Sequence, residues 1–126
     1  MSPSDLRPSV WIGHVVMETD RIEESAAFML KIGMRSIHEG PDVAILELRG
    51  GTHLILTRKS TVDPGPAPFD LMVDDVHNAH RLFTSLGLAP TSIEAIPSVN
   101  HEVFRIQEPA GHVISVYSSH VEGRPV

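Results

Sequence analysis

Three residues carry side chains that could together bind a metal ion or move a proton: His14, His53 and Asp70. Two imidazoles and one carboxylate form a ligand set that divalent transition metals use in proteins. Without a metal, Asp70 beside either histidine could act as an acid–base pair, with His14 and Asp70 as the first candidates. Because the three residues are far apart in the sequence, this chemistry depends on a fold that brings them together.

Each candidate lies in a segment with the composition of a strand. The segments Val10 to Glu18, Thr52 to Thr57, Phe69 to Val73 and His112 to Ser118 are apolar and rich in β-branched residues. Residues two apart on a strand share a face, so an inward-facing set can be read from the alternation. With the aromatic Trp11 added, the expected ligand-binding residues are Trp11, His14, His53, Ile55, Asp70, Met72, Ser115 and Tyr117.

The strands belong to a pattern that occurs twice. A helix capped by Asp20 and ended by Gly33 follows the first strand, and a helix capped by Asp74 and ended by Gly87 follows the fifth. At an offset of 54 residues Asp20 falls on Asp74 and Gly33 falls on Gly87, as in an internal repeat.

The repeat predicts an α+β fold made of two βαβββ modules in tandem within a single domain, residues 1–126. The modules span about residues 10–59 and 69–120, and the Pro-rich segment 60–68 links them. Each sheet has its helix on one face, so two sheets pair as a cupped, partly open β-barrel with the helices outside. A small ligand would bind in the space between the sheets.

Composition narrows the class of protein. The chain has a net charge of −6 and scattered Lys and Arg residues, which argues against a nucleic-acid partner. It has no cysteine, so disulfides and thiolate chemistry are excluded. Residues 1–8 are polar, which predicts a loose arm rather than a signal peptide. No apolar run is long enough to span a membrane. We therefore expect a cytoplasmic protein.

The ordered motifs resemble the vicinal-oxygen-chelate superfamily, also called the glyoxalase/bleomycin-resistance/dioxygenase family. The resemblance rests on segments in both modules: Gly13-His14-Val15-Val16, Asp20 to Met34, Val73 to Gly87, and Glu108-Pro109-Ala110-Gly111-His112-Val113-Ile114. It covers residues 11–119. It implies the two-module fold, small-molecule binding and a homodimer, whereas activity differs between proteins that share one fold.

The resemblance also implies where a metal would bind. Metal-dependent members use inward positions on strands 1, 4, 5 and 8, which here are His14, Ile55, Pro68 and Ser115. Only His14 can be a ligand, so the inherited site is degenerate. His53 and Asp70 are each two residues from such a position, and with His14 they are the candidate ligands of a displaced site.

Three functions follow as hypotheses. The first is binding of a small, mainly apolar organic molecule, with any chemistry independent of metal. The second is a divalent-metal-dependent lyase, isomerase or dioxygenase that uses His14 with His53 and Asp70. The third is resistance by antibiotic sequestration in a dimer groove. The cofactor is accordingly none or a divalent metal ion, and whether the chain is an enzyme stays open. His112, which follows the Gly111 turn, reads as structural.

Overall fold

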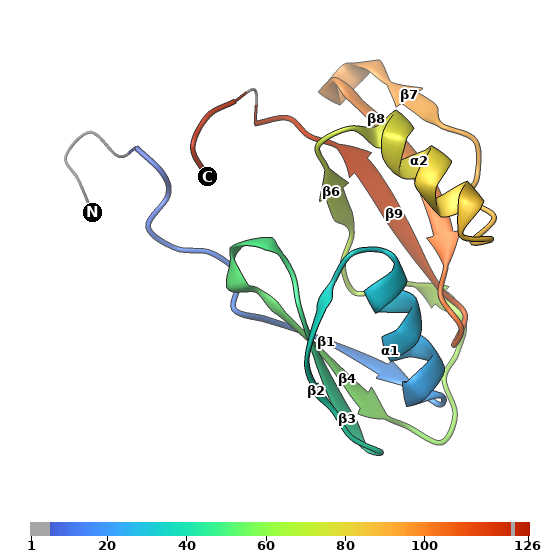
Figure 1. Ribbon diagram of the computed structural model, residues 1–126. Helices are drawn as coiled ribbons and strands as arrows, with labels where there is room; N and C mark the ends of the chain where they lie inside the picture. Colours follow the sequence, from blue (N-terminus) through green and yellow to red (C-terminus); the bar gives the residue numbers. More distant parts are fainter. Residues whose placement is uncertain (1–5, 122) are drawn as a thin grey trace.

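The computed structural model describes residues 6–121 and 123–126, and it contains two sheets with one α-helix on each (Figure 1). The first sheet has the strand order β1-β4-β3-β2. Its elements are β1 (His14–Thr19), α1 (Ile22–Lys31), β2 (Arg35–Glu39), β3 (Val43–Glu47) and β4 (His53–Arg58), with a short 3-10 turn, η1 (Arg49–Gly51), before β4. β1 runs parallel to β4, and the other pairs are antiparallel.

The second sheet repeats this plan after the linker. Its strand order is β5-β9-β8-β7, and β6 also pairs with β9. The elements are β5 (Gly65–Pro66), β6 (Leu71–Val73), α2 (Val76–Ser85), β7 (Glu94–Ile96), η2 (Pro97–Val99), β8 (His101–Gln107) and β9 (His112–Ser118). The two sheets are separate rather than joined in a closed barrel, which confirms the predicted α+β fold with a partly open barrel.

One face of each sheet packs on its helix, because apolar residues alternate along the strands. In β1, Met17 and Thr19 are buried, whereas His14, Val16 and Glu18 are exposed. The buried positions of both sheets and both helices join in one hydrophobic core. Its most deeply buried members include Met17, Met29, Leu46, Leu54, Leu56, Phe104, Ile114 and Val116. We call the side of each sheet away from its helix the open face.

Both helix starts differ from the prediction by one residue. The N-cap of α1 is Arg21 and makes no side-chain cap, because Asp20 forms an ion pair with Arg21 instead. The N-cap of α2 is Asp75, whose carboxylate accepts a hydrogen bond from the Asn78 N–H. Asp74 is bound by Arg49. The capping role predicted for Asp20 and Asp74 was therefore wrong.

Over residues 6–121 and 123–126, no helix is long and apolar enough to cross a membrane. The arm predicted for residues 1–8 lies largely outside this range, since residues 1–5 are not among those described.

Candidate functional site

The structure brings His14 and His53 together on the open face of the first sheet. They are register partners in the parallel pair of β1 and β4, and their ring centroids are 5.9 Å apart. Val16 and Ile55 are the partners two residues along the same strands. The result is a patch of two imidazoles beside two apolar side chains, as the strand alternation predicted.

Glu47 on β3 fixes the position of the His53 ring. It is the antiparallel partner of His53, and its Oε2 lies 3.0 Å from His53 Nε2. Arg35 on β2 binds the other carboxylate oxygen through Nε at 2.9 Å. Hydrogen bonds from Arg35, and then from His53, lower the pKa of Glu47 below its ordinary 4.5. Our prediction missed Glu47, although its position two residues after Ile45 places it on the open face.

Asp70 lies in a different place. It precedes β6 and lines a cavity of about 180 Å³ together with Val15, Leu48, Arg49 and Phe69, among others. The structure therefore does not assemble Asp70 with the two histidines: across the described part of the chain, no group of three or more His, Asp or Glu side chains is arranged to hold a metal ion.

The remaining predicted residues divide between two places. Met72 on β6 and Tyr117 on β9 are register partners on the open face of the second sheet, and Ser115 lies two residues before Tyr117. Tyr117 packs edge-on against His101, with ring centroids 5.4 Å apart. Trp11, which is 72% exposed, lines a cavity of about 610 Å³ with Arg7 and Arg49.

A divalent metal does not fit the residues that the fold would offer. Of the four positions implied by the resemblance, Ile55, Pro68 and Ser115 provide neither an imidazole nor a carboxylate, and His14 is the exception. The pair of His14 and His53 supplies two nitrogen ligands, and His53 is already engaged by Glu47. Among residues 6–121 and 123–126, one chain thus offers no third ligand with suitable geometry.

Solved structures similar to this chain share its whole architecture. Lactoylglutathione lyase from Agrobacterium tumefaciens superposes with a TM-score of 0.74 at 20% identity, over 94% of this chain and 100% of that one. A bleomycin-binding protein in complex with bleomycin gives 0.70 at 15% identity, over 89% and 100%. A fosfomycin resistance protein from Listeria monocytogenes gives 0.71 at 11% identity, over 92% and 98%.

This chain has the vicinal-oxygen-chelate fold. No family model matches the sequence, and no curated protein matches it either. At these levels of identity the structural likeness establishes the fold, and the ligand has to be argued from the residues of this chain.

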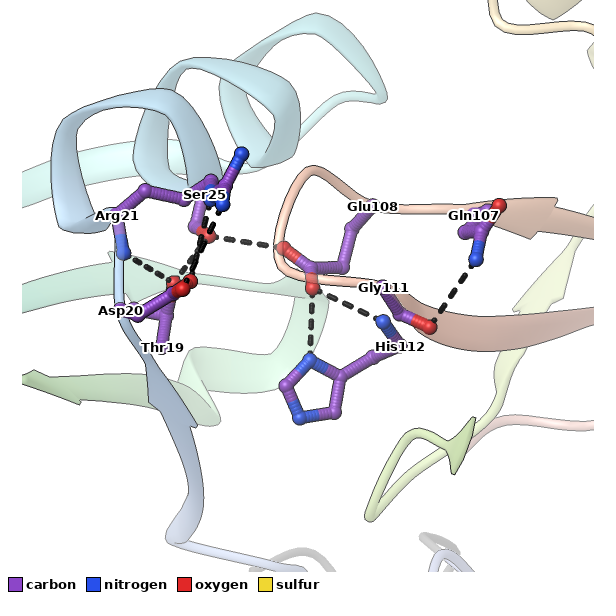
Figure 2. A network of polar contacts seen from close by, with 8 residues as sticks. All are labelled: Thr19, Asp20, Arg21, Ser25, Gln107, Glu108, Gly111 and His112. Atoms are coloured by element: carbon purple, nitrogen blue, oxygen red, sulfur yellow. Dashed lines mark hydrogen bonds and ion pairs between the residues drawn. The ribbon is translucent and has the colours of Figure 1, made fainter. Parts of the chain in front are cut away.

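In this vicinal-oxygen-chelate fold, a buried polar network joins the two modules (Figure 2). Glu108, directly after β8, has a fully buried side chain. One carboxylate oxygen accepts hydrogen bonds from the backbone N–H (3.1 Å) and Nδ1 (2.7 Å) of His112, and the other accepts from the Ser25 hydroxyl (2.8 Å) on α1. Ser25 Oγ is 2.7 Å from Thr19 Oγ1.

The proton positions in this network follow from its geometry. The Arg21 N–H donates to Thr19 Oγ1, so the Thr19 hydroxyl is free to donate to Ser25 and Ser25 can donate to Glu108. Three donors then converge on Glu108. An ionised carboxylate only accepts hydrogen bonds, so it suits this arrangement. Our prediction gave His112 a structural role but missed its buried carboxylate partner.

Proposed function

We propose that this protein binds a small, mainly apolar organic molecule on its open sheet faces. The observation that carries the proposal is the mixed surface formed by His14, His53 and Ile55 on the face of the first sheet away from α1. Val16 in this patch is 52% exposed and Met72 on the second sheet is 43% exposed, which is costly for apolar side chains left in water. An apolar ligand held by one or two polar groups suits such a surface.

A second copy of the chain would enclose the ligand-binding space that one chain leaves open. Each open face is one wall, and the helix-covered faces of the two sheets already share one core within the chain. We therefore propose a homodimer in which open faces from two copies enclose the ligand, with Ser115 and Tyr117 contributing to the wall opposite His14. A monomer at micromolar concentration in sedimentation velocity would contradict the dimer.

The proposed chemistry is metal-independent, because the candidate metal positions do not supply a ligand set. His14 lies on the open face, and its imidazole could exchange a proton with a ligand. Asp70 would join it in acid–base work only if the second copy brought Asp70 to this face. The compartment we propose is the cytoplasm, in keeping with a chain that has no cysteine.

The binding proposal can be tested with N-phenyl-1-naphthylamine, a neutral apolar dye that fluoresces when it is shielded from water. We expect saturable binding by the wild-type protein and loss of at least tenfold in affinity for Ile55→Asp, since the new carboxylate would be desolvated by the dye. Leu82→Asp is the matched control, because Leu82 is 52% exposed on the outer surface of α2. Equal loss in both variants would refute a site on the open face.

Sequestration of an antibiotic is the second candidate function. It is favoured by the fold likeness to a bleomycin-binding protein, whose site holds bleomycin. The two candidates differ in ligand size and outcome: sequestration requires binding of a drug-sized molecule without turnover. Isothermal titration with bleomycin separates them, since a micromolar or tighter Kd supports sequestration and no heat at millimolar concentration excludes this drug as the ligand.

A further inference from the structure

His112, the partner of the buried Glu108, lines a pocket that adjoins the open-face patch of His14 and His53 and shares Val16 with it. The pocket has a volume of about 490 Å³ and lies where the ends of β1 and β4 meet the linker and the start of β9. Its lining includes Val16, Val62, Pro66 and Pro68 as apolar groups and Glu18, Thr57, Lys59, Asp63 and His112 as polar ones. The lining thus combines polar and apolar groups, which suits a small ligand that carries a polar group beside an apolar one.

His112 is built into the wall of this pocket. Its side chain is 10% exposed, and its Nδ1 is committed to the buried Glu108 carboxylate at 2.7 Å. Figure 2 shows the other ring nitrogen, Nε2, on the side of the imidazole away from Glu108. Within residues 6–121 and 123–126, this nitrogen makes no hydrogen bond or ion pair. A nine-tenths-buried polar group therefore presents an unused nitrogen to the pocket.

Glu108 determines what that nitrogen can do. A carboxylate that accepts from Nδ1–H holds the neutral imidazole in the tautomer whose Nε2 carries a lone pair. The ring cannot turn over without breaking the 2.7 Å contact and leaving a buried carboxylate short of a donor. Nε2 is consequently an oriented hydrogen-bond acceptor, the arrangement in which a carboxylate-held histidine receives a proton from a hydroxyl.

The charged groups at the rim indicate which ligands are compatible. Lys59 is 3.6 Å from Glu18, so its charge is largely balanced there. Asp63 is exposed and makes no hydrogen bond or ion pair within the described ranges. The rim thus adds a further acceptor rather than a free cation, and it disfavours an anionic ligand.

We propose that this pocket is a second small-molecule site, in which His112 Nε2 accepts a hydrogen bond from a hydroxyl or amine of a neutral or cationic organic ligand. The apolar part of the ligand packs on Val62, Pro66 and Pro68. The proposal does not rest on the open-face function, because it uses a different histidine, although the two sites share Val16 at their border.

Phenol and anisole are the probes that test it, because they differ in the hydroxyl hydrogen that Nε2 would accept. Each is titrated into the wild-type protein while amide and imidazole chemical shifts are recorded. We expect phenol to bind about tenfold more tightly than anisole, the ratio for one well-formed hydrogen bond, with the largest chemical-shift changes at His112 and in the 60–68 linker. Equal affinities, no binding, or changes confined to His14 and His53 would overturn the proposal.

Two variants separate the ligand contact from the structural role of the histidine. His112→Asn keeps an N–H donor near Glu108 and lacks the pocket nitrogen, so it should bind phenol and anisole equally. Val62→Trp leaves the polar network intact and fills the pocket, so it should lose both probes. A preference for phenol that survives in His112→Asn, or phenol binding that is unchanged in Val62→Trp, would overturn the assignment. Failure of the open-face dye experiment would leave both results unaffected.

Discussion

Replacing Glu108 with alanine should destabilise the protein by about 3–5 kcal/mol, because it removes the shared acceptor of three buried hydrogen bonds. Glu108 is 1% exposed and accepts three hydrogen bonds, two from His112 and one from Ser25. Alanine leaves these donors without an acceptor, and each unmet buried donor costs about 1–3 kcal/mol. Water entering the vacated space would offset part of this cost, so the sum stays near the stated range.

Glu108→Gln should cost much less, about 1–2 kcal/mol, because the network can reverse two of its hydrogen bonds. The amide oxygen can accept from both donors of His112, while the amide nitrogen donates to Ser25. Ser25 then donates to Thr19, whose Oγ1 is 2.7 Å away. The remaining cost is the loss of charge assistance in the bonds to His112, together with the loss of an acceptor for the proton of the buried Thr19 hydroxyl.

Urea unfolding, followed by circular dichroism, measures the change in the free energy of unfolding for both variants. A similar slope m in each variant and the wild type confirms that unfolding exposes a similar surface area. Glu94→Gln is the matched control: Glu94 is exposed on β7, and surface substitutions of this kind change stability by about 0.5 kcal/mol or less. The reasoning is refuted if Glu108→Ala lies within 0.5 kcal/mol of that control, or if Glu108→Gln is as damaging as Glu108→Ala.

Two further predictions concern single contacts. Arg35→Ala should raise the pKa of Glu47 toward 4.5, because the Arg35 hydrogen bond is the largest cause of its depression. Since that pKa is lowered in the folded state, its stabilising effect is present above the unfolded pKa and is lost as the pH falls through the folded pKa. Carboxyl NMR titration of Glu47 decides this, and an unchanged midpoint contradicts it. Gly111→Ala should destabilise the protein by about 1–3 kcal/mol, because φ is +98° and a Cβ would lie 3.1 Å from Pro64 Cβ; thermal unfolding equal to wild type contradicts it.

The open-face pair of histidines was predictable because it depends on a local rule. Once β1 and β4 are recognised as strands, alternation gives the face of His14 and of His53, and the parallel register makes them neighbours. The same rule failed for Asp70, because β6 begins at Leu71 and alternation does not extend into the preceding loop. The prediction placed the N-cap of α2 at Asp74, one residue early, because two adjacent aspartates are both candidates. In the structure, Asp75 is the one whose carboxylate reaches the Asn78 N–H.

The buried network could not be predicted from local patterns. Ser25 and Glu108 are 83 residues apart in sequence and meet through the packing of the two modules. One signal was available: Ser25 interrupts the apolar stripe of α1, and a polar group buried there needs a partner. The identity of that partner depends on tertiary structure. A glutamate in a turn motif is ordinarily read as solvated, and here it is the centre of the network.

Metal analysis of protein purified without chelators tests the central claim most directly. Binding of a small organic molecule without a metal cofactor predicts less than about 0.1 equivalents of zinc, nickel, manganese or iron per chain, because a hard divalent ion needs about three protein ligands and this chain offers His14 alone at the expected positions. Near-stoichiometric metal that is lost in His14→Ala would contradict the account and establish a metal centre on the open face.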